Sequence, residues 1–172
     1  MTQHTFNFTG TVTQYEILDG GEDPFNGSIV AGMPLSGSLT FASPAEDYQP
    51  DNTSYYYFAG GDFGIRLQID SNEFVFHDLH IFVDSGMYGF NNFIFEFYPD
   101  KLSCHMENVG VDFVDGEVPT SPPEIRPDTR FHTELSGQRI INGYQHRFKV
   151  RFNLDAITQA NSRPSSPQLS IP

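Results

Sequence analysis

The chain has 172 residues and a mass of 19.4 kDa, which suits a single domain with its own core. Its 22 acidic and 9 basic residues give a formal net charge of −13, and so acidic a surface repels the phosphate groups of nucleic acids and anionic membranes. We therefore exclude general nucleic-acid binding. The single cysteine, Cys104, has no partner for an intrachain disulfide.

The apolar content of the chain bears on its compartment. No apolar run approaches the length of about 20 residues needed to cross a bilayer, so we expect no membrane insertion. The first residues, MTQHTFNFTG, enter a strand-like pattern at once and do not form an export signal. As written, the sequence predicts a soluble protein, and an exported one if a signal peptide has been removed.

Apolar and polar residues alternate with a period of two along much of the chain, as in half-buried antiparallel strands. In the first such segment, Phe6, Phe8 and Val12 share one face and the threonines occupy the other. A short polar connector, residues 70–73, predicts a hairpin turn. The predicted strands are residues 6–13, 35–41, 55–58, 65–69, 74 onward, 92–98 and 146–157, with weaker patterns over 104–108 and 109–114.

Acidic, glycine-containing and proline-rich segments separate these strands and predict loops. They are residues 19–27, 43–52 and 117–127. Residues 159–172 are rich in Pro and Ser and predict a disordered tail. No segment has a convincing helical period. We therefore predict an all-β fold, a single-domain antiparallel β-sandwich over residues 1–158, with a closed β-barrel as the alternative.

Residues 77–84, HDLHIFVD, concentrate two histidines and two aspartates. In a strand, residues i and i+2 share a face whereas i and i+3 do not, so His77 and His80 are expected to point apart and not to hold one metal ion together. The pattern places His77 beside Leu79 on an apolar face, as a buried or rim histidine. Asp78 and His80 share the other face and are the candidates for a catalytic role in proton transfer.

Aromatic residues are abundant, with 17 Phe and 8 Tyr. Most aromatic side chains fill protein cores, but those on strands can also line a cavity or form a surface on which sugar rings stack. The candidate ligand-binding residues are Tyr55, Tyr57, Phe93, Phe95 and Phe97.

The first acidic loop could bind Ca²⁺, an ion that takes about six to eight oxygen ligands. The candidate ligands are Asp19, Glu22, Asp23 and Asn26. Their spacing differs from that of an EF-hand, and a solvated turn is the simpler interpretation. The second acidic loop, with Glu46, Asp47 and Asp51, is interpreted in the same way. No other cofactor is expected.

Four segments carry a family resemblance: FTGTVTQY, GMPLSGSLTF, IRLQIDSNEFVF and RFKVRFNLDAIT. Together they resemble a β-rich domain of exported bacterial proteins that often carry a C-terminal Pro-Glu-Pro sorting segment. The resemblance extends over most of residues 6–158 and implies an exported, cell-surface or matrix-associated module with no assigned catalytic residues. The chain departs from this pattern at Met33, where relatives usually carry Asp in a Gly-Asp-Pro turn, and in having neither a signal peptide nor a sorting segment.

The sequence contains no G-x-S-x-G nucleophile motif, no P-loop and no G-x-G-x-x-G motif. We therefore expect a non-catalytic binding or structural module whose ligand is a glycan or a cell-surface partner. One alternative is a β-barrel enzyme of the isomerase or cyclase type, or a carrier, for a small hydrophobic molecule. The other is an adhesion domain stabilised by Ca²⁺.

Overall fold

The structure is a computed structural model, and it describes residues 2–48, 54–60, 62–84, 87–94, 101–109, 122, 130–160 and 163–164. Within these residues all regular structure is β and no helix occurs, which confirms the predicted all-β class. The strands are β1 (Thr2–Ile17), β2 (Pro34–Ser43), β3 (Ser54–Ala59), β4 (Gly64–Ile69), β5 (Asn72–Phe76), β6 (Asp78–Asp84), β7 (Met87–Ile94), β8 (Lys101–Val109), β9 (Arg130–Ile141), β10 (Tyr144–Gln159) and β11 (Arg163–Pro164).

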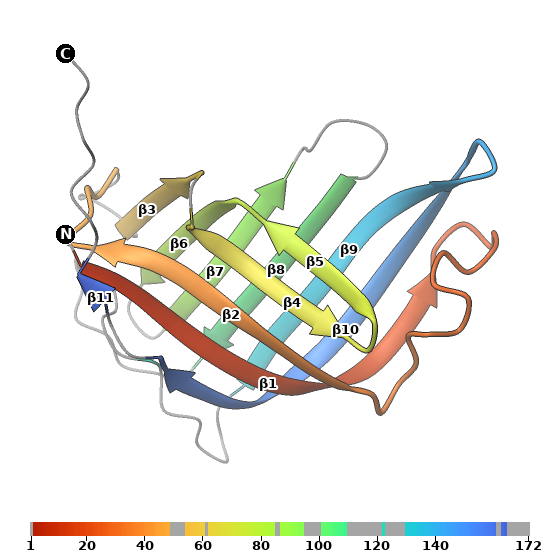
Figure 1. The fold of residues 1–172 in the computed structure, drawn as a ribbon, viewed down its shortest axis with the longest axis horizontal. Coiled ribbons are helices and arrows are strands. Elements are labelled where there is room, and N and C mark those ends of the chain that lie inside the picture. The colour runs from red at the N-terminus through yellow and green to blue at the C-terminus, as the bar shows by residue number, and fades with distance from the viewer. Residues whose placement is uncertain are drawn as a thin grey trace.

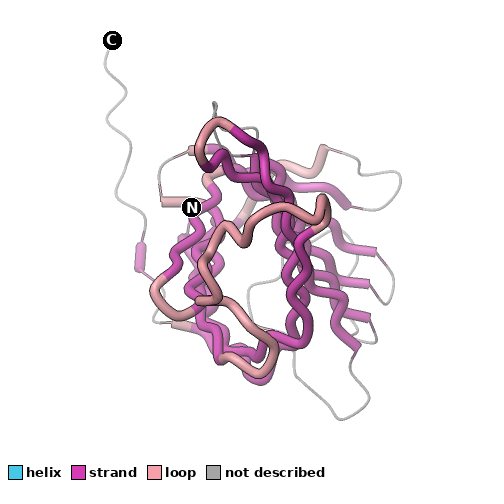
Figure 2. Tube along the Cα trace, turned by 90° about the vertical axis from the view of Figure 1, so that its right-hand side faces the viewer, coloured by secondary structure: helices cyan, strands magenta, loops and turns pink. Residues whose placement is uncertain are grey.

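A single antiparallel sheet contains all of these strands. Its order is β3-β6-β7-β8-β9-β10-β1-β2-β4-β5, and β11 pairs with the start of β1. The sheet curls on itself, so that β4 and β5 at one end come close to β6 and β7 near the other (Figure 1, Figure 2). The fold therefore combines the facing layers of a sandwich with the continuous wall of a barrel, the two arrangements that the sequence predicts.

The alternation of the first and last long strands fills the space inside this curl. Phe6 and Phe8 of β1 and Phe148 and Phe152 of β10 are all buried. The two strands are neighbours, with Val12 opposite Phe152. Removing these large apolar side chains from water is the main favourable contribution to folding.

Aromatic packing joins the two halves of the sheet. The ring of Phe41 on β2 lies 6.0 Å from the ring of Phe58 on β3, and Phe58 in turn meets Phe63 at 5.7 Å. Because β2 and β3 lie far apart in the strand order, this contact fixes the β3 end of the sheet against the opposite layer.

His77 connects β5 to β6 and is exposed, so the prediction of a histidine on an apolar face beside Leu79 is wrong. In β5 the buried side chains are Phe74 and Phe76, whereas over residues 78–82 of β6 they are Leu79 and Ile81. The alternation therefore shifts by one residue at His77. Here the chain leaves one end of the sheet and enters the other, and each strand sets its inward face separately.

The loop between β1 and β2 is anchored in the core by Phe25 and Ile29, which are 4% and 0% exposed. The ring of Phe25 packs edge to face on Phe148 at 4.8 Å, and the guanidinium of Arg139 lies 4.7 Å from its centre. The acidic residues of the predicted turn thus sit on a loop that the interior holds in place.

β9 has no counterpart among the predicted strands. It pairs with β8 on one side and with β10 on the other. Among its described side chains, residues 133–141, the buried ones are Thr133 and Leu135, and only Leu135 is apolar, so the hydropathy pattern there is weak. Hydrogen bonds to two neighbouring strands position this segment.

The hairpin between β4 and β5 has a shorter turn than predicted. Asn72 pairs with Ile69, so the turn is the two residues Asp70 and Ser71. Asp70 has a positive φ of 52°, a conformation that Asp and Asn tolerate well.

Parts of the other predictions lie outside the described residues. These are residues 95–98 and 110–114 of predicted strands, residues 49–52, 117–121 and 123–127 of predicted loops, and residues 161–162 and 165–172 of the predicted tail. Within the tail region, β10 continues to Gln159 and β11 pairs with Thr2 and Gln3.

Cys104 lies on β8 and is 1% exposed. Its sulfur is a free thiol, and burial raises the pKa of that thiol to about 12. The sole cysteine of the chain is therefore part of the core.

Substitution of adjacent β10 residues tests the inward–outward assignment. Phe152→Ala should lower the free energy of unfolding by about 3–5 kcal/mol, because it leaves a cavity in the core. Arg151→Ala should cost less than about 1 kcal/mol, because it removes only surface interactions, an ion pair with Glu134 and a hydrogen bond to Gln14. Equal losses in urea unfolding would contradict the assignment.

Candidate functional site

The outer face of β3 and β6 carries a contiguous group of aromatic side chains. Cross-strand register places Tyr55 opposite Phe82 and Tyr57 opposite His80. The alternate residues of both strands point into the core, so these four point outward. Tyr48, on the loop after β2, adds a fifth ring. We call Tyr48, Tyr55, Tyr57, His80 and Phe82 the aromatic platform.

The rings of the platform contact one another in series. Tyr48 lies 6.0 Å from Tyr55, and Tyr55 stacks on Phe82 at 4.8 Å. His80 lies between the two strand tyrosines, 5.7 Å from Tyr55 and 4.8 Å from Tyr57. Tyr48 and Tyr57 are the most open, at 54% and 40% exposed. The result is a row of rings along one surface, with exposed tyrosines at both ends.

Hydrogen bonds fix these rings in place. The hydroxyl oxygen of Tyr55 and Nδ1 of His80 are hydrogen-bonded at 2.6 Å. The hydroxyl of Tyr57 donates to Oδ1 of Asp78 at 3.4 Å. Tyr55 and Tyr57 are therefore each linked to a polar side chain of β6, which limits the rotation of both phenol groups.

The ionisation of the platform follows from partial burial and from one carboxylate. Burial lowers the pKa of His80, against the opposing charge of Asp78, so the imidazole is neutral at pH 7. Burial and the charge of Asp78 raise the pKa of Tyr57, and burial raises that of Tyr55. Near neutral pH the platform thus consists of uncharged rings beside a carboxylate.

The platform has a rigid support beneath it. Tyr56 and Phe58, the inward neighbours of the exposed tyrosines, are buried, and so are Leu79 and Ile81 on β6. The loop after β2 closes the start of β3, because the Tyr48 N–H donates to the Tyr55 carbonyl at 2.8 Å. The backbone under the rings is therefore fixed from both sides.

The structure brings together four of the residues selected from the sequence, namely Tyr55, Tyr57, Asp78 and His80. For the other candidate ligand-binding residues the structure gives little information. Phe93 lies on β7 opposite Ser103, its side chain is not among those described, and Phe95 and Phe97 lie outside the described residues. The ligand and catalytic roles of all these residues stay predictions.

Sequence reasoning missed two members of the platform as ligand-binding residues. Phe82 has a usable signal, since it is two residues from His80 on the same strand face. Tyr48 has none, because it lies in an irregular loop and reaches the platform only through the packing of that loop on β3.

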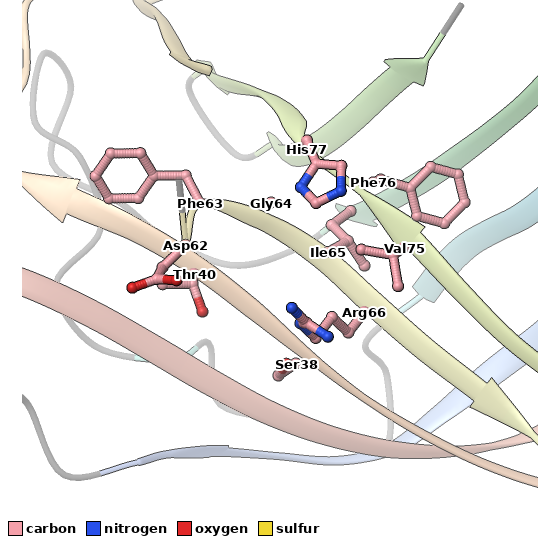
Figure 3. Close-up of a pocket in the computed structure, with 10 residues that line it drawn as sticks. All are labelled: Ser38, Thr40, Asp62, Phe63, Gly64, Ile65, Arg66, Val75, Phe76 and His77. Carbon is pink, nitrogen blue, oxygen red and sulfur yellow. The ribbon is translucent and has the colours of Figure 1, made fainter. Parts of the chain in front are cut away.

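The outer face of β2, β4 and β5 holds a small polar hollow, shown in Figure 3. Side chains of Asp62, Arg66 and His77 surround it together with Ser38 and Thr40. Its volume is about 20 Å³, enough for about one water molecule. His77 therefore lies at this hollow, and not with His80 on the platform.

A larger groove of about 390 Å³ lies over β1, β2 and β4 on the same outer face. Its lining side chains are mostly polar, and they include Arg66 and Glu73, an exposed ion pair at 3.6 Å. Phe8 is the only aromatic residue in the lining, and it is 2% exposed. The groove is large enough for a ligand but presents no open ring.

The carboxylates of the first acidic loop accept hydrogen bonds from the chain itself. Asp23 accepts from the Tyr15 hydroxyl at 2.5 Å and from the N–H groups of Phe25 and Gly27 at 2.9 and 2.6 Å. Asp19 accepts from the Arg147 N–H at 2.9 Å, and this bond lowers its pKa. These oxygens organise the loop directly.

Among the described residues, no group of three or more His, Cys, Asp or Glu side chains is arranged to hold a metal ion. Glu22 and Asn26 are exposed on the same loop. A Ca²⁺ site at Asp19, Glu22, Asp23 and Asn26 stays a prediction from the sequence.

Replacing Asp23 should destabilise the protein in a pH-dependent manner. Partial burial acts to raise the Asp23 pKa, but the three hydrogen bonds outweigh it and the pKa is lowered from 3.8. The stabilisation that the ionised Asp23 carboxylate contributes is thus complete above pH 3.8, and it is lost as the pH falls through the lowered pKa of Asp23. Asp23→Asn should cost about 1–2 kcal/mol at pH 7 and less in acid, measured by urea unfolding. The exposed Glu22→Gln is the control, and equal costs would contradict the role of Asp23.

Thermal unfolding with Ca²⁺ tests the predicted metal site. We expect about 5 mM CaCl₂ to leave the Tm unchanged relative to EDTA, because the carboxylates of Asp19 and Asp23 already accept hydrogen bonds from the chain. An ion that bound the native state would raise the Tm. A rise in Tm that Asp19→Asn abolishes would establish the Ca²⁺ site.

Comparisons with known proteins identify no protein similar to this chain. No family model, no curated protein and no solved structure matches the chain. Of the residues described, none forms a helix with the length and apolar character of a membrane span.

Proposed function

We propose that the protein is a non-catalytic glycan-binding module that holds sugar rings on the aromatic platform. The observation that carries this proposal is the row of five rings on the outer face of β3 and its surroundings, with exposed tyrosines at both ends. An exported, cell-surface location, which the family resemblance implies, is part of the same proposal.

The chemistry of a pyranose suits such a surface. One face of a sugar ring is formed by C–H groups, which pack on an aromatic face by dispersion and by release of water. The hydroxyl groups at its rim need hydrogen-bond partners, and Asp78 and the Tyr57 hydroxyl lie at the edge of the rings. A rigid row of rings also loses little conformational entropy on binding.

The geometry favours this function over an enzyme or carrier with an aromatic-lined interior. The aromatic side chains of the core, such as Phe6, Phe41 and Phe148, are packed against their neighbours. Both hollows described above lie on the outer face of the sheet. On the platform, Nδ1 of His80 is engaged by Tyr55, which supports a positioning role for this imidazole.

Binding to a panel of immobilised neutral and charged glycans tests the proposal. Tyr57→Ala should weaken retention of the bound glycan at least about tenfold, since we expect the loss of this exposed contact ring to cost about 1.4 kcal/mol or more. Tyr57→Phe keeps the ring and should stay within about threefold of the original protein, because the hydroxyl adds only one hydrogen bond.

Tyr144→Ala is the matched control. Tyr144 is 73% exposed and begins β10 at the β9–β10 hairpin, away from β3 (Figure 1). Its replacement should leave binding unchanged. Retention of no glycan, or equal effects of the two alanine substitutions, would overturn the proposed function.

A further inference from the structure

The sequence that forms and flanks the aromatic platform carries charges of one sign. The stretches of sequence that form and flank it, residues 43–63 and 78–94, contain six carboxylates and neither Lys nor Arg. Their one histidine is His80, whose lowered pKa keeps it neutral at pH 7. No cationic side chain of these stretches offsets the carboxylates.

Two of these carboxylates contact residues of the platform. Oδ1 of Asp78 accepts the hydrogen bond from the Tyr57 hydroxyl at 3.4 Å. Oδ1 of Asp47, next to Tyr48 in sequence, accepts from the Tyr55 N–H at 2.9 Å. A sugar chain lying along the rings would therefore pass the negative charge of Asp78 beside Tyr57 and lie near that of Asp47 beside Tyr55.

The rings and the carboxylates favour the same kind of ligand group. The face of an aromatic ring attracts a cation through its quadrupole, and a carboxylate attracts it through its charge. The charge of Asp78 also acts on the rings, since together with burial it raises the pKa of Tyr57. An anionic group at the same place would meet repulsion from both.

On these grounds, and resting on the proposed function, we infer that the platform selects cationic glycans: oligosaccharides of amino sugars with free, protonated amines. Neutral oligosaccharides of the same linkage bind more weakly, through the rings alone. Oligosaccharides of uronic acids bind weakest of the three.

Calorimetry with three matched oligosaccharides tests the inference. The probes are oligomers of glucosamine, of glucose and of a β-linked uronic acid, equal in length and linkage. A mildly acidic buffer keeps the amines protonated, while the lowered pKa of His80 favours a neutral platform histidine. The glucosamine oligomer should bind at least about tenfold more tightly than the glucose oligomer, a difference of about 1.4 kcal/mol.

Substitution of one carboxylate identifies the source of the preference. Asp78→Asn keeps the size of the side chain and removes its charge, and it should reduce the ratio of the affinities for the glucosamine and glucose oligomers about threefold or more. Glu22→Gln removes the same charge from the distant loop between β1 and β2 and should leave the preference unchanged. Raising NaCl from about 0.02 M to about 0.5 M should reduce the preference as well.

The outcomes separate the charge preference from the proposed function. Equal binding of all three oligomers, with Tyr57→Ala weakening each, overturns only the charge preference. An unchanged preference in Asp78→Asn, or tightest binding of the uronic acid oligomer, also overturns it. Failure of every oligomer to bind overturns both.

Discussion

Packing of Phe41 against Phe58 links the β3 end of the sheet to the opposite layer, and the presentation of the proposed site depends on it. β3 stands last in the strand order, so among the strands that the structure describes only β6 holds it by a ladder of hydrogen bonds. An end strand supported in this way alone would be weakly held. The inward rings fix β3 from behind, and its outward tyrosines can therefore form a rigid surface.

Alternation in the sequence predicts the strand faces well wherever one strand crosses the core without interruption. Phe6, Phe8, Phe148 and Phe152 point inward as the period of two requires. The same reasoning fails at His77, because alternation carries no information about where the chain passes from one end of a curled sheet to the other. The sequence does not predict β9 for a different reason. The position of this strand depends on pairing with β8 and β10 and only weakly on its own side chains.

The same distinction applies to the candidate site: the face that a residue occupies within one strand can be predicted from the sequence, but its neighbours on other strands cannot. Asp78 and His80 can be assigned to one face from the sequence, because both belong to a single strand. Their proximity to Tyr55 and Tyr57 depends on the pairing of β3 with β6, strands separated by the whole β4–β5 hairpin. Register over such a separation follows from the closure of the complete sheet. The inclusion of Tyr48 depends, further still, on the conformation of a loop.

Cys104 gives the molecule an internal reporter of its own opening. A thiol reacts as the thiolate, and a buried group with a pKa of about 12 has almost none, so alkylating reagents reach it only when the strands around it separate. Since the chain has one cysteine, each modified molecule records one such event. The rate of modification in native buffer then measures how often β8 separates from its neighbours β7 and β9, without any label or substitution.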